Sequence, residues 1–118
     1  MKKMLVIFST PPYQNSHTVE MLEAAMVGAV FDFQVSLLFR DQGVWCLQNE
    51  QNAVSLGRRT VGKVLQAMPA YDVSAIYACA PSVNAAHLDP SRLKPLPQLL
   101  EHSAQAILLA EQHFVLSA

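Results

Sequence analysis

The two cysteines of this chain of 118 residues, Cys46 and Cys79, are the side chains best suited to do chemistry. Cys79 lies in the stretch YACAPS, where an apolar run typical of a strand passes into a predicted helix that begins with a proline. A thiol at such a junction lies near the positive end of a helix dipole, which favours the nucleophilic thiolate. Free cysteine is also one of the most buried residue types, so a purely structural role for Cys79 stays open.

Cys46 follows a tryptophan in the stretch GVWCL, and these apolar neighbours indicate packing in a core or an interface. The two cysteines are far apart and form no C-x-x-C motif, which predicts free thiols in a reducing compartment. The histidines lack the spacing of metal ligands with either cysteine, so we expect no metal and no cofactor. These histidines are His17, His87, His102 and His113.

The loop STPPYQNS has the position of a phosphate site, because such loops precede a helix in nucleotide-binding proteins. It contains no glycine, and its two prolines lack the N–H groups that hold a phosphate. A flavodoxin-like ligand-binding domain therefore remains only an alternative. A hydrolase site could be drawn from Ser9, Thr10, His17 and His87, but the G-x-S-x-G context is absent. We expect the aromatic residues Tyr13, Trp45 and Tyr71 to anchor interfaces.

Strands and helices alternate along the chain, and this order positions both cysteines. The pattern predicts strands at 3–9, 33–39, 73–80, 96–100 and 114–117, and helices near 19–30, 61–68, 82–88 and 103–112. We expect caps at Ser16 or Thr18 and at Ser103, and a permissive backbone at Gly43. Two prolines make 96–100 an edge strand.

The predicted fold class is α/β: a single domain over residues 1–118 with a mostly parallel, five-stranded sheet and helices on both faces. Ligands of such sheets bind beyond the carboxyl ends of the strands. In this chain those ends lead into STPPYQNS, RDQGVWC and CAPSV. Both cysteines are therefore expected in or near the functional edge.

The composition excludes some classes of function. The net charge of −1 provides no basic field for nucleic acid, so we expect no direct nucleic-acid binding. Charged residues make up 14% of the chain, against about 25% in ordinary domains. Such a low proportion suggests that part of the surface is covered in an oligomer. No apolar run approaches the roughly 18 residues of a membrane span, and we expect a cytoplasmic protein.

Four segments together resemble the DsrE/DsrF-like family, in its TusC/DsrF branch. They are VIFSTPPY, VSLLFRDQGVWCL, VLQAMPAYDV and YACAPSVNAAHLD, and their order and spacing span the chain. The resemblance implies a sulfur-relay subunit that assembles with TusB-like and TusD-like subunits as a dimer of heterotrimers. Such a complex takes persulfide sulfur from a TusA-like donor and passes it to a TusE-like acceptor, for 2-thiolation of the tRNA wobble uridine.

The DsrF members of the branch imply a second function, as subunits of a DsrE–DsrF–DsrH complex in sulfur oxidation. In the family, the persulfide carrier lies on the TusD/DsrE subunit, at the position that Cys79 occupies in this sequence. The resemblance therefore makes Cys79 a possible persulfide carrier, and equally a residue of a partner subunit that carries no sulfur. Relatives often have two acidic residues before the glycine of the RDQGVWC segment. This chain has Gln42 at the second position, so Asp41 is the single acidic residue there.

Overall fold

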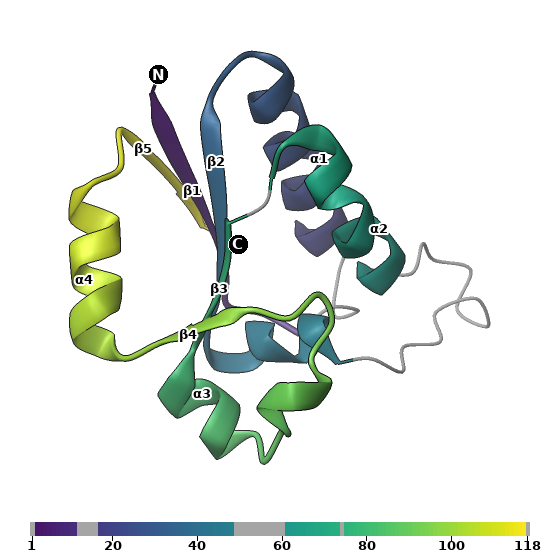
Figure 1. Ribbon diagram of the computed structural model, residues 1–118, viewed down its shortest axis with the longest axis vertical. Coiled ribbons are helices and arrows are strands. Elements are labelled where there is room, and N and C mark those ends of the chain that lie inside the picture. The colour runs from purple at the N-terminus through teal and green to yellow at the C-terminus, as the bar shows by residue number, and fades with distance from the viewer. Residues whose placement is uncertain (1, 12–16, 49–60, 74, 118) are drawn as a thin grey trace.

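The computed structural model describes residues 2–11, 17–48, 61–73 and 75–117 (Figure 1). Within this part of the chain, the strands form one five-stranded sheet in the order β4-β3-β2-β1-β5. Every neighbouring pair is parallel. The strands are β1 (Lys3–Phe8), β2 (Gln34–Phe39), β3 (Ala75–Cys79), β4 (Gln98–Leu100) and β5 (Phe114–Ser117). The predicted α/β class, the number of strands and the edge position of β4 are confirmed.

The helices lie on both faces of this sheet, as predicted. Figure 1 shows α1 and α2 on one side, α4 on the other, and α3 beyond the carboxyl end of β3. The helices are α1 (His17–Val30), α2 (Val61–Ala67), α3 (Ala80–Ala85) and α4 (His102–Ala110). Short 3-10 helices complete the described elements: η1 (Asp41–Leu47), η3 (Met68–Tyr71) and η4 (Pro90–Arg92). No helix in these described ranges is long and apolar enough to cross a membrane.

The central strands are apolar on both faces because helices cover both. Successive side chains of a strand point to opposite faces, so β1 divides its residues between two layers. The larger layer lies under α1 and α2 and contains Met4, Val6, Phe8, Leu37 and Phe39. The smaller layer contains Leu5, Ile7 and Leu38, against which Tyr77, Leu108 and Leu109 pack. Continuous apolar runs in β1 and β2 are thus the expected signature of parallel strands buried on both sides.

Gly43 is required for a reason other than the one predicted from the sequence. A Cβ atom at Gly43 would collide with the backbone carbonyl of Phe8, so η1 approaches the end of β1 too closely for any side chain. The left-handed backbone of this turn falls on Asp41 instead, with φ of 52°. Close approach, rather than a permissive dihedral angle, therefore explains this glycine.

The predicted helix caps are wrong where the structure describes them. Thr18 lies inside α1 and is buried, and Ser16 lies outside the described residues. The N-cap of α4 is Glu101, one residue before the helix, and it makes no side-chain cap bond. The third helix begins at Ala80, two residues earlier than predicted, because Pro81 is accepted in its first turn.

Candidate functional site

The carboxyl ends of β1, β2 and β3 form the edge at which the sequence predicts the functional site. Phe8 and Phe39 close the first two strands as a stacked pair, with ring centroids 4.8 Å apart. The Arg40 N–H donates to the Phe8 carbonyl at 3.0 Å and so joins the exits of both strands. The chain then enters η1 after β2, and α3 directly after β3.

One hydrogen bond ties these two exits together beside Cys79. The backbone N–H of Asp41 donates to Oγ of Ser82 at 2.9 Å, so the first residue of η1 is bound to the first turn of α3. Asp41 is exposed and holds a left-handed backbone, which a non-glycine residue adopts only at some cost. The RDQGVWC and CAPSV segments are therefore joined, as their positions at the same sheet edge predict.

Cys79 is both the last residue of β3 and the N-cap of α3. Its backbone is extended, with φ of −69° and ψ of 115°, and only 1% of the residue is exposed. Ala78 belongs to the layer under α1 and α2, whereas Tyr77 packs on the α4 side. Because side chains alternate along a strand, Cys79 lies on the α4 face with Tyr77. In the isolated chain this thiol has almost no contact with solvent, so an external sulfur donor could reach it only after it is uncovered.

Cys46 lies in η1 and belongs to the larger core layer, fully buried. Burial raises the pKa of its thiol from 9.0 to about 12, and a backbone hydrogen bond opposes part of this change. A thiol with such a pKa is almost entirely protonated at neutral pH and is a poor nucleophile. The prediction that Cys46 is a packing residue is confirmed, and both cysteines are free.

The other residues singled out from the sequence are scattered. Trp45 is half-buried and packs against the core with part of its surface, so its role as an interface anchor stays a prediction. Tyr71 is exposed at the end of η3, and Tyr13 lies outside the described residues. His87 is exposed just after α3, with φ of 58°. Among the residues described, no three His, Cys, Asp or Glu side chains gather in a way that could hold a metal ion.

Two features of this edge do not follow from the sequence. The Asp41–Ser82 bond joins segments 41 residues apart, and no local pattern reveals such a pair. A cavity lies between Gln48 and the segment from His87 to Lys94, and Cys79 does not line it. Its only sequence signal is the Asp-Pro-Ser-Arg stretch, typical of a capped turn that presents a cation.

Comparison with known proteins identifies the family to which this fold belongs. The model of the DsrE/DsrF-like family matches residues 2–117. The chain belongs to the DsrE/DsrF-like family. It is 30% identical over 108 residues to a protein TusC homolog of Pseudomonas aeruginosa, covering 92% of this chain and 91% of that protein.

Two further relatives place the chain in the TusC/DsrF branch. A protein TusC homolog of Pasteurella multocida is 24% identical over 117 residues, which is 98% of either chain. The intracellular sulfur oxidation protein DsrF of Allochromatium vinosum is 31% identical over 84 residues, which is 71% of this chain and 62% of DsrF.

Solved structures agree on the fold at low sequence identity. The ychN protein from E. coli superposes with a TM-score of 0.85 at 14% identity, over the whole of both chains. A protein of unknown function from Methanobacterium thermoautotrophicum gives a TM-score of 0.72 at 10% identity, again over both whole chains. At these identities the likeness supports the DsrE-like fold and nothing more specific.

Proposed function

We propose that this chain is a subunit of a TusBCD-type sulfurtransferase complex, which relays persulfide sulfur for 2-thiolation of the tRNA wobble uridine. The observation that carries the proposal is the similarity to the Pseudomonas aeruginosa TusC homolog over nearly the whole of both chains. In this role the chain assembles with TusB-like and TusD-like subunits in the cytoplasm and does not grip tRNA itself.

The surface and the cysteines support a partner role. Apolar side chains are exposed at the end of α1 and along β5, and a permanent subunit would bury such residues against its partners. They include Val27, Val30, Phe31, Phe114, Val115 and Leu116. Cys46 is held as a thiol in the core, and Cys79 is covered, so neither offers a ready nucleophile in the free chain.

Cys79 remains the residue of this chain that could carry sulfur. In that reaction its thiolate attacks the outer sulfur of a donor persulfide, a new S–S bond forms on Cys79, and the donor leaves as its thiolate. No external oxidant is needed, because one S–S bond replaces another. The covered position of Cys79 means that contact with a partner subunit or donor would have to expose it first.

Co-expression tests the assembly directly. The chain is tagged and expressed with TusB-like and TusD-like subunits from the same organism, and we expect one complex with all three subunits in equal amounts. Recovery of the chain alone, under conditions in which the other two subunits associate, would contradict the proposal.

Mass spectrometry of the assembled complex tests the role of Cys79. After loading with a persulfide donor, a carrier cysteine gains about 32 Da, the mass of one added sulfur atom. An adduct on Cys79 supports a carrier role for this chain. An adduct confined to the TusD-like subunit rejects that role and leaves the assembly proposal intact.

The second candidate function is that of a DsrF-type subunit in sulfur oxidation. It is favoured by the 31% identity to DsrF of Allochromatium vinosum, although that match spans a shorter part of both proteins. The two functions differ in their partners and in the neighbouring genes. Co-purification with DsrE-like and DsrH-like subunits, and sulfite-reductase-type genes nearby, would favour the oxidative role.

A further inference from the structure

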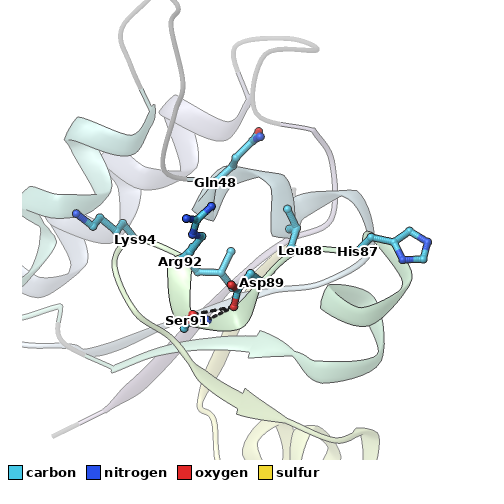
Figure 2. A pocket seen from close by; sticks show the side chains of 8 residues that line it. Gln48, His87, Leu88, Asp89, Ser91, Arg92 and Lys94 are labelled. Carbon is cyan, nitrogen blue, oxygen red and sulfur yellow. Dashed lines mark hydrogen bonds between the residues drawn. The ribbon is translucent and has the colours of Figure 1, made fainter.

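A cavity of about 580 Å³ opens beside the loop that follows α3 (Figure 2). It lies near the edge of the sheet at which β3 ends, and open α/β sheets bind their ligands beyond the carboxyl ends of their strands. Its volume is in the range of small-molecule sites, roughly 300–1,000 Å³. Cys79 and Cys46 are not among the residues that line it.

The wall of this cavity is fastened by backbone hydrogen bonds. The Lys94 N–H donates to the Leu47 carbonyl at 2.9 Å, and the Leu88 N–H donates to the Val83 carbonyl at 3.2 Å. The wall is therefore anchored to η1 at one end and to α3 at the other. These bonds belong to the fold itself, and preformed sites lose less entropy on binding.

Polar and apolar groups meet in the cavity in an arrangement that suits an anion. Figure 2 shows the guanidinium of Arg92 directed toward Gln48, with Leu88 on the same side of the loop. Lys94 and His87 point outward at opposite ends of the loop. Leu88 is half-buried against the core and provides an apolar surface.

The acidic residue of the cavity is already bound to its own loop. Oδ1 of Asp89 accepts the Ser91 N–H at 3.0 Å and the Ser91 hydroxyl at 2.7 Å. These bonds from Ser91 are the main causes that lower the pKa of Asp89. The charge of Arg92 lowers it further, but by the smallest amount. Asp89 thus serves as the cap of η4, and among the residues that the structure describes its side-chain hydrogen bonds go to Ser91 and not to the guanidinium of Arg92.

We propose that this cavity binds a small organic anion, a phosphate ester or a carboxylate, whose charged group pairs with Arg92 while its apolar part contacts Leu88. Arg92 and Lys94 against Asp89 give the lining a net positive charge, although the chain as a whole carries −1. The planar guanidinium donates two parallel hydrogen bonds to a carboxylate or phosphate, which fixes the orientation of the ligand. This inference is independent of the proposed sulfur-relay function.

Amide chemical shifts of the ¹⁵N-labelled full chain test the site. Phenyl phosphate and benzoate are titrated separately, with phenol as the neutral probe of the same ring. We expect saturable shifts that cluster in residues 87–94 and at Gln48 with at least one anion, and none with phenol. The stronger of the two anions identifies phosphate or carboxylate as the preferred group.

Three variants decide whether Arg92 is responsible. Arg92→Gln should weaken binding of the preferred anion about tenfold, since it removes hydrogen bonds that are donated to a charged group. Arg92→Lys keeps the positive charge but lacks the planar guanidinium. Its affinity for the anion should lie between those of Arg92→Gln and the unmodified chain. Lys2→Gln removes an exposed cation that lies over Phe114, and it should leave binding unchanged. The same spectra report whether each variant is folded.

Two results would overturn the proposal. One is the absence of saturable shifts in residues 87–94 at millimolar concentrations of both anions. The other is binding that does not depend on the anionic group. This would be seen as an affinity that Arg92→Gln leaves unchanged in a folded chain, or as phenol binding as tightly as the anions.

Discussion

At Gly43, a single hydrogen atom in place of a side chain lets η1 lie against the end of β1. The neighbour that a Cβ atom would meet is the Phe8 carbonyl, which belongs to a central strand and cannot move aside. The Gly43 N–H also donates to the Arg40 carbonyl at 2.9 Å, which holds the turn closed. The same turn carries Asp41, so the packing at Gly43 positions the site edge.

Gly43→Ala should therefore lower the free energy of unfolding by about 1–3 kcal/mol, the usual cost of overpacking a filled site. Urea denaturation measures it. Gly28→Ala is the matched control, because its Cβ atom would press only on the flexible end of Met4 and would lie at ordinary contact distance from Val35, and alanine gains up to about 1 kcal/mol in helices. Equal losses in the two variants would show that the Phe8 contact is not what requires a glycine.

Cys46 gives the stability of this chain a dependence on alkaline pH. Folding raises the pKa of the thiol from 9.0 to about 12, so between these values the unfolded chain loses a proton that the native chain keeps. The contribution of this group to stability is complete below pH 9 and falls as pH rises through that window, by at most about 1.4 kcal/mol per pH unit.

The variant Cys46→Ala isolates this dependence from the other groups that titrate at alkaline pH. Urea unfolding at pH 8, 9 and 10 should give a steeper fall for the unmodified chain than for the variant. Parallel curves for the two proteins would mean that the Cys46 thiol is not held in its protonated form by the fold.

At the scale of elements, the sheet edge depends on the bond between η1 and α3. Ser82→Ala removes the acceptor of the Asp41 N–H and should cost about 0.5–1.5 kcal/mol of stability. Amide hydrogen exchange at Asp41 should become faster as well. Ser91→Ala is a comparable change in another loop, and it should leave exchange at Asp41 unaltered. An unchanged exchange rate at Asp41 in Ser82→Ala would show that this bond does not hold the two loops together.

The elements themselves could be predicted well because their signals are local. The buried runs of β1 and β2 and the alternation of strands with helices were sufficient to predict a parallel sheet with two covered faces. The caps were wrong, since a hydroxyl residue near a helix start does not reveal whether it lies before or inside the helix. Thr18 is an example, inside α1 and buried.

For the candidate site, the sequence predicts where Cys79 lies in the fold but not how it is buried or what surrounds it. The sequence placed Cys79 correctly where a strand becomes a helix. Its backbone lies opposite Leu100 of β4, a strand that is distant in the chain, and its 1% exposure is a property of the assembled sheet. For the same reason, neither the Asp41–Ser82 bond nor the cavity beside Arg92 could be found by reading the chain locally.

At the scale of the whole molecule, the surface is sparsely charged and partly apolar. Phe31 is 72% exposed at the end of α1, and Val27 and Val30 are exposed beside it in the sequence. Hydrophobic groups of this size, together with 14% charged residues, are unfavourable on a free monomer.

We therefore expect the isolated chain to associate in dilute solution, and its complex with partner subunits to be more soluble than the chain alone. Sedimentation velocity over a concentration series measures this behaviour. A stable and soluble monomer at every concentration would argue that the exposed apolar residues are not an interface.

The most direct measurement of the central claim is the 2-thiouridine content of tRNA in a strain that lacks this chain. We predict loss of the 2-thio group from the wobble uridine, restored by the unmodified gene in trans. The Cys46→Ala variant should also restore it if the variant folds, since that residue acts only in packing. Unaltered 2-thiouridine in the deletion strain, with the TusD-like subunit still present, would contradict a role in tRNA thiolation.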